Sequence, residues 1–140
     1  MQRKLTQGEL LDGRGQLIEA GYATEEARRY RRAAVKAGWH RIKEWDYYAV
    51  LNDRYGFACV VADNGYMGLL NAVWLDFEKP GFIEEGIITP FPRGRMKLPE
   101  SADQGDIVQH HPRMEIAFRH VPGGRIGDRL GDTTPDMQGW

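Results

Sequence analysis

Two acidic side chains two positions apart, Glu44 and Asp46, are the best candidates for acid–base chemistry in this chain. They lie in the run Arg41–Leu51, whose aromatic and β-branched residues predict a strand. Alternate residues of a strand share a face, so both carboxylates would point to one side. Two carboxylates about 7 Å apart in a cavity can differ in pKa enough to act as acid and base. The alternative is that both face water, or pair with Arg and Lys side chains of a neighbouring strand.

Aromatic residues of the same region are candidates for lining a cavity that holds an apolar ligand. They are Trp45, Tyr47, Tyr48, Tyr66 and Trp74. Tyr66 follows Asp63-Asn64-Gly65, which is either a polar rim at the mouth of a cavity or a tight turn, the role that its composition favours. Plain core packing is the alternative role for each of these aromatic residues.

Other kinds of site find little support in the sequence. His110 and His111 are neighbours and would point to opposite faces of a strand, so we expect no metal and no cofactor. Ser101 is the single serine and no Gly-x-Ser-x-Gly motif surrounds it. Cys59 lies in an apolar run, which indicates a packing residue.

The one dense basic run is Arg28-Arg29-Tyr30-Arg31-Arg32. Cations beside an aromatic ring can contact phosphates and stack on a base. On a helix, however, four arginines would spread around the circumference and pair with nearby glutamates. The net charge is −1, so we interpret the run as a solvated helix face and expect no nucleic-acid partner.

Three segments are expected before and around these residues. Residues 1–23 form an irregular, glycine-interrupted lead-in. The segment 24–37 predicts one short helix, because Thr24 can cap its start, Glu25 and Glu26 suit its first turn and Gly38 follows its end. From 41 to 77 the chain predicts a three-strand antiparallel meander, with Gly56 in the first hairpin loop available for a positive φ.

The second half predicts shorter elements. The proline-rich stretch 78–106 should contain edge strands and loops but no long ladder. Residues 107–110 and 114–121 each have the pattern of a strand. Residues 122–140 have few apolar residues and no periodicity, so we expect a disordered tail after a single β domain spanning 24–121.

The length of 140 residues suits one domain. A single cysteine, an N-terminus without an apolar stretch of signal-peptide length and the absence of any run of about 18 apolar residues predict a cytoplasmic protein without a membrane span.

Four sequence words resemble a known family, the bacterial domain of unknown function 2804. The words are Arg41–Tyr48, Ala62–Gly68, Phe91–Gly94 and Leu98–Ser101, and the similarity runs from about Leu10 to about Val121. It corresponds to the N-terminal portion of longer members, and the chain departs from the pattern after Arg125. We therefore expect a truncated or frameshifted copy, whose domain is incomplete and whose unpaired strand edges would favour self-association.

The resemblance implies a lipocalin-like β fold that encloses an apolar ligand, and no catalytic residues come with it. The predicted fold is mainly β, either a partial lipocalin-like barrel or an open antiparallel sheet, with one short N-terminal helix. The predicted function is binding of an apolar or amphipathic small molecule. The alternatives are a hydratase- or isomerase-type enzyme that uses Glu44 and Asp46, and an interaction protein that completes its sheet with a partner.

Overall fold

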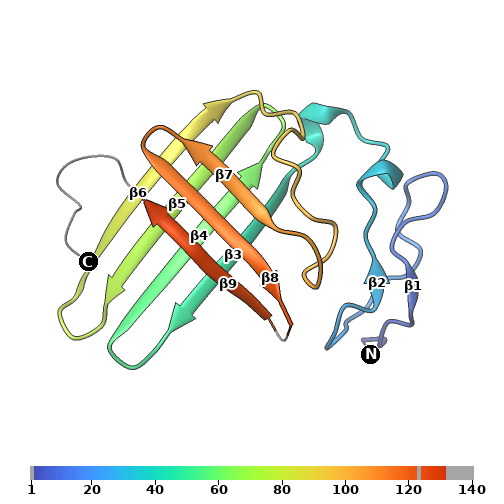
Figure 1. Cartoon of the computed structure of the whole chain (residues 1–140). Coiled ribbons are helices and arrows are strands. Elements are labelled where there is room, and N and C mark those ends of the chain that lie inside the picture. The colour runs from blue at the N-terminus through green and yellow to red at the C-terminus, as the bar shows by residue number, and fades with distance from the viewer. Residues whose placement is uncertain (1, 123, 132–140) are drawn as a thin grey trace.

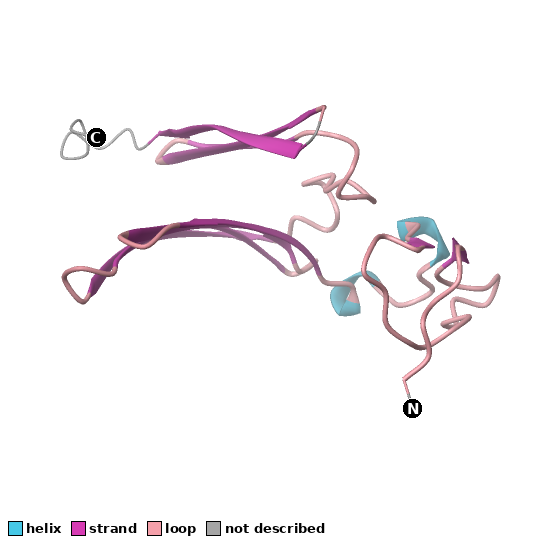
Figure 2. Ribbon diagram, turned by 90° about the horizontal axis from the view of Figure 1, so that it is seen from below, coloured by secondary structure: helices cyan, strands magenta, loops and turns pink. Residues whose placement is uncertain are grey.

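Two antiparallel sheets, stacked face to face, form the main body of the structure (Figures 1 and 2). The computed structural model describes residues 2–122 and 124–131. One sheet has the strand order β3-β4-β5-β6 and the other has the order β7-β8-β9. The strands are β3 (Glu44–Leu51), β4 (Tyr55–Asp63), β5 (Met67–Asp76), β6 (Gly81–Pro90), β7 (Ile107–His111), β8 (Met114–Val121) and β9 (Gly124–Gly131). Within the described residues neither sheet closes on itself, so the predicted mainly β open sheet is confirmed.

The predicted meander is confirmed as β3, β4 and β5. Asn52 ends the first strand, because its side-chain oxygen accepts hydrogen bonds from the backbone of Arg54 and Tyr55 at 2.8 and 2.9 Å. At the second turn Gly65 adopts a φ of 75°, which a residue without Cβ does at little cost. Gly56 has no positive φ: it lies inside β4, where a Cβ would come within 2.7 Å of a Leu51 methyl group. Close packing therefore explains that glycine.

The proline-rich stretch contains a longer strand than predicted. β6 pairs with β5 over ten residues, from Gly81 to Pro90. The prolines do not interrupt this ladder because Pro80 precedes the strand and Pro90 ends it. β6 is an edge strand, as the prolines predicted, but the inference that they exclude a long ladder was wrong.

The core lies between the two sheets. Alternate residues of β4 and β5 pack against β7 and β8, and the buried cluster comprises Cys59, Val61, Leu70, Ala72, Ile87, Ile107, Met114, Ile116 and Phe118. Burial raises the pKa of the Cys59 thiol to about 11, which leaves it protonated and unreactive at neutral pH. Its predicted role as a packing residue is confirmed.

The predicted N-terminal helix over 24–37 is wrong. The segment contains β2 (Arg28–Arg29), which pairs in parallel with β1 (Gly8–Glu9), and a single 3₁₀ turn, η1 (Arg32–Ala34). A second 3₁₀ turn, η2 (Trp39–Arg41), follows. Among residues 2–122 and 124–131, no helix is long and apolar enough to cross a membrane.

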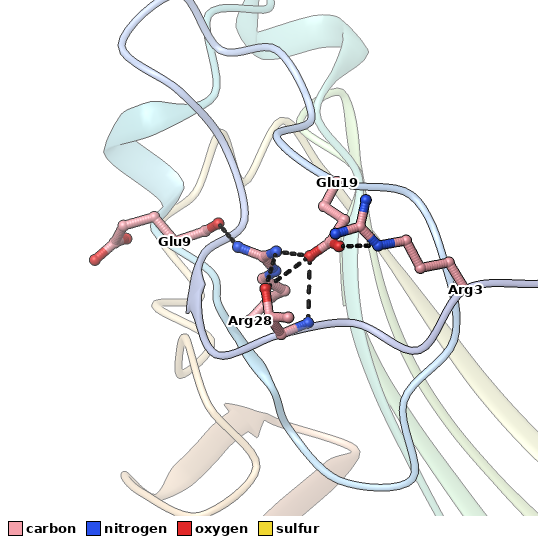
Figure 3. A network of polar contacts seen from close by, with 5 residues as sticks. Arg3, Glu9, Glu19 and Arg28 are labelled. Carbon is pink, nitrogen blue, oxygen red and sulfur yellow. Dashed lines mark hydrogen bonds and ion pairs between the residues drawn. The ribbon is translucent and has the colours of Figure 1, made fainter.

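Ion pairs explain why the basic run is extended. Arg29 and Arg31 both form ion pairs with Glu9. The side chains of Arg28, Tyr30 and Arg32 contact other glutamates. Arg28 donates to Glu19, and both side chains are about nine-tenths buried (Figure 3). Arg3 Nε lies 2.9 Å from the same carboxylate. Side chains that find one partner at every second residue require an extended chain. Breaking the buried Arg28–Glu19 pair would cost more free energy than the packing of a helix over 24–37 could return.

The prediction of a disordered tail from 122 was wrong for Gly124–Gly131, which form β9 and pair with β8. Pairing on a strand edge uses backbone groups, so it needs no apolar periodicity in the added strand. Residues 132–140 lie outside the described part of the chain.

Two isoleucines test this core. Ile116 on β8 is 1% exposed and Ile88 on β6 is 68% exposed. We expect Ile116→Ala to lower the free energy of unfolding by about 2–4 kcal/mol through lost transfer energy and a residual cavity. The matched change Ile88→Ala should cost no more than about 0.5 kcal/mol. Guanidinium titrations of both variants measure the difference, and equal losses would contradict the assigned core.

Candidate functional site

The four sequence motifs that resemble the family all lie at one end of the four-stranded sheet, at the upper right in Figure 1. The start of β3, the β4–β5 turn and the loop after β6 lie together there. Backbone hydrogen bonds join them: Phe91 N–H donates to the Tyr66 carbonyl and Arg93 N–H to the Gly65 carbonyl, each at 3.0 Å. A site at this end is therefore built from segments far apart in sequence.

Two carboxylates stand directly opposite each other at this end. Glu44 on β3 is the register partner of Asp63 on β4, and such neighbours have Cβ atoms about 5 Å apart. Asp63 is fully buried. Its carboxylate accepts hydrogen bonds from the backbone N–H of Gly65 at 2.9 Å and of Met96 at 3.4 Å. Asp63 thus holds the β4–β5 turn and the 91–97 loop together.

Glu44 obtains its donors from the N-terminal part of the chain. The Tyr30 hydroxyl donates to Glu44 Oε1 at 2.6 Å, and the Arg32 guanidinium donates to Glu44 Oε2. Burial, followed by the hydrogen bond to the Glu44 carboxylate, raises the pKa of Tyr30 well above its ordinary value. Tyr30 is therefore held as a neutral donor, and both oxygens of Glu44 are occupied.

A pocket of about 310 Å³ opens beside this pair. Its lining combines charged, hydroxyl and apolar groups, and consists of Tyr30, Lys43, Glu44, Trp45, Asp46, Leu98 and Pro99. The lining thus combines residues of the first strand, of the basic run and of the motif Leu98–Ser101. The predicted pair Glu44 and Asp46 lines one pocket, and both side chains are half-buried on the inner face of β3.

The predicted aromatic residues lie in several different places. Trp45 lines the pocket and is 63% exposed, and Tyr47 is 59% exposed on the same outer face of β3. Tyr48 packs on Phe118 with ring centroids 4.3 Å apart. Trp74 stacks on Tyr55 at 4.6 Å, toward the other end of the sheet. The Tyr66 hydroxyl accepts a hydrogen bond from Lys43 Nζ at 3.1 Å.

Sequence reasoning missed Tyr30, Arg32 and Lys43 as site residues. The first two were assigned to a solvated helix face, and the sequence RRYRR has no alternation of residue type that would have indicated an extended chain. Lys43 directly precedes β3 and lines the pocket.

Comparison with known proteins gives one match. The family model described as "Domain of unknown function (DUF2804)" matches residues 2–138. This match is longer than the stretch from Leu10 to Val121 predicted from the sequence words, and it includes residues after Arg125. No match was found among curated proteins or among solved structures.

The Tyr30–Glu44 contact predicts how stability depends on alkaline pH. The pKa of Tyr30 is raised from its ordinary value of 10.0, so the folded chain keeps a phenolic proton that the unfolded chain loses. The stabilising contribution is fully present below about pH 10 and declines as the pH rises above that value. Tyr30→Phe should cost about 1 kcal/mol at neutral pH and should show a smaller further loss between about pH 9 and 11. Denaturant titrations at both pH values measure it, and parallel losses in the two proteins would contradict the contact.

Proposed function

The chain belongs to the domain of unknown function (DUF2804) family, whose description assigns no activity, and we propose from the site itself that it binds an amphipathic small molecule. The observation that carries the proposal is the pocket at the end of the four-stranded sheet. It offers an apolar side, made of Trp45, Leu98 and Pro99, next to polar groups of Lys43 and Asp46. Ligand sites commonly combine apolar walls with a few such polar groups.

The lining suggests how a ligand would be oriented. The indole of Trp45 is largely exposed, so covering it with a ring or chain would bury apolar surface and favour binding. The charges of the lining are mixed, because it contains Lys43 together with Glu44 and Asp46, and Arg32 pairs with Glu44. A neutral or zwitterionic polar end fits this mixture better than a strongly charged one.

We place the ligand at the sheet end rather than between the sheets, as the lipocalin-like prediction would have it. The inner faces of β4, β5, β7 and β8 carry side chains that pack on one another in the core cluster. A ligand there would have to displace fully buried residues such as Val61 and Ile107. The sheet end requires no such displacement.

Binding is also a better proposal than acid–base catalysis. The enzyme alternative needs Glu44 to exchange a proton, but both of its oxygens already accept hydrogen bonds from Tyr30 and Arg32. A carboxylate held in this way is suited to positioning the wall of a pocket. The hydratase- or isomerase-type reading therefore has no specific observation in its favour.

The neutral amphipathic dye N-phenyl-1-naphthylamine tests the pocket. We expect its fluorescence to rise on binding, and Trp45→Ala to weaken that binding by roughly tenfold, because about 1.4 kcal/mol of apolar contact is lost. The control is Tyr47→Ala, which removes an aromatic ring from the same face of β3 outside the pocket lining. Equal dye affinity in the parent and both variants would contradict the proposed site.

A second candidate function, sheet completion with another copy of the chain, has its own observation. β3 and β6 each pair with one neighbour in the described residues, and the outer face between them carries exposed apolar side chains. The most exposed are Trp45, Tyr47, Leu51, Phe82 and Ile88. Figure 2 shows no described segment over this face. Open edges and apolar faces of this kind favour association.

Size-exclusion chromatography with light scattering tests this second candidate. We expect the mean mass to rise above that of the monomer as concentration increases. The double change Phe82→Lys/Ile88→Lys places two charges on β6 and should shift the protein to monomer. A monomer at every concentration would contradict self-association. The control Glu84→Lys, on the same face of the same strand, adds charge without removing apolar surface.

A further inference from the structure

The sheet end carries a second surface, beside the pocket, in which cations and exposed aromatic rings alternate. We call it the basic–aromatic surface, and it consists of Trp39, Lys43, Tyr66, Phe91, Arg93 and Arg95. Arg93 lies over the rings of Trp39 and Phe91, with its guanidinium carbon 4.7 and 5.7 Å from their centroids. Lys43 Nζ lies 5.1 Å from the centroid of Tyr66. Arg95 Nη2 donates to the Phe91 carbonyl at 2.6 Å, and Phe91 N–H donates to the Tyr66 carbonyl at 3.0 Å, so the two groups adjoin.

The loop that presents these groups is held in one shape. Phe91, Arg93 and Lys97 have positive φ values of 47°, 53° and 52°, each of which costs a residue other than glycine about 1 kcal/mol or more. Hydrogen bonds within the loop, from Arg95 N–H to the Pro92 carbonyl and from Lys97 N–H to the Gly94 carbonyl, maintain it. The loop is therefore a fixed platform that holds its cations outward.

Little negative charge opposes those cations. Asp63 is buried beneath the loop and accepts hydrogen bonds from backbone N–H groups. Glu44 is paired with Arg32, and Glu100 accepts a hydrogen bond from the Arg32 backbone. Asp46, which lines the pocket with Lys43, is half-buried. The side chains of Lys43, Arg93 and Arg95 are exposed, as is that of Lys97 in the same loop. The surface is thus locally cationic on a chain whose net charge is −1.

An anionic lipid surface suits these groups better than a single phosphate or a nucleic acid. The N–H groups of Phe91, Arg93, Arg95 and Lys97 donate to carbonyls and that of Met96 donates to Asp63, so these groups form no backbone cradle for one small anion. Cations already lie over the rings on which bases would stack. The surface also continues into the exposed apolar side chains of Trp45 and Tyr47. Tryptophan and tyrosine beside lysine and arginine is the combination found at membrane interfaces.

We propose that the basic–aromatic surface docks the protein on an anionic lipid membrane. Lys43, Arg93, Arg95 and Lys97 attract the anionic headgroups, and the rings of Trp39 and Phe91 enter the interface. This docking is peripheral. It goes beyond the proposed ligand binding, because it requires no occupied pocket, although Lys43 belongs to both surfaces.

Vesicle sedimentation of the full chain tests the proposal. The probes are vesicles of phosphatidylcholine alone and of phosphatidylcholine with about one third phosphatidylserine. We expect binding to the anionic vesicles alone, and weaker binding as salt is added. The double change Arg93→Gln/Arg95→Gln should lower the partition coefficient by roughly tenfold or more, since each cation near the surface contributes about a factor of five.

A matched variant separates the proposed surface from charge in general. Arg54→Gln/Arg113→Gln also removes two exposed arginines, at turns outside the basic–aromatic surface, and should bind anionic vesicles like the parent protein. Trp45→Ala should keep most vesicle binding while its dye binding weakens by roughly tenfold, so the two proposals can fail separately. Equal binding to both kinds of vesicle, or equal losses in the two arginine variants, would overturn the proposal. Binding of a single-stranded oligonucleotide in place of vesicles, with the same dependence on Arg93 and Arg95, would also overturn it and assign the surface to nucleic acid.

Discussion

Two like charges placed opposite each other are the constraint on which this structure depends. Glu44 and Asp63 are register partners on adjacent strands, an arrangement that is unfavourable by itself. Each carboxylate is satisfied by separate donors, and hydrogen bonds to a charged group contribute about 1.5–3 kcal/mol each. Those donors outweigh a repulsion on the order of 1 kcal/mol between the two charges. Donors from other segments therefore stabilise this end of the β3–β4 ladder.

The position of those donors explains the architecture of the sheet end. The Asp63 carboxylate accepts a hydrogen bond from the backbone of Met96, which holds the long connection after β6 over the β4–β5 turn. Glu44 binds the Tyr30 hydroxyl and the Arg32 guanidinium, and these contacts hold the N-terminal segment beside β3. The pocket lies between these two segments, and the basic–aromatic surface is the outer side of the same loop. Both surfaces are thus consequences of how two carboxylates are satisfied.

The sequence could predict what depends on neighbours in the chain. The β3–β5 meander, the Asp63–Gly65 turn and the shared face of Glu44 and Asp46 follow from periodicity and turn chemistry, which are local. What it could not predict depends on distant partners. The prediction of a helix over 24–37 was wrong because Glu9, Glu19 and Glu44 all form ion pairs with arginines of the basic run. β9 was missed because its pairing uses the backbone of β8, and no apolar pattern records that.

The hydrogen bonds of Glu44 favour the proposed binding over the catalytic alternative. A catalytic carboxylate must be able to gain and lose a proton near neutral pH, which requires that its environment leave the protonated form accessible. Glu44 stands between a guanidinium and a phenol that burial holds in its neutral, donating form. Both of its oxygens thereby hold the junction between the N-terminal segment and β3. Because Glu44 both lines the pocket and holds two segments together, the pocket is better suited to binding a molecule than to changing it chemically. The basic–aromatic surface lies beside it, with its cations and rings exposed.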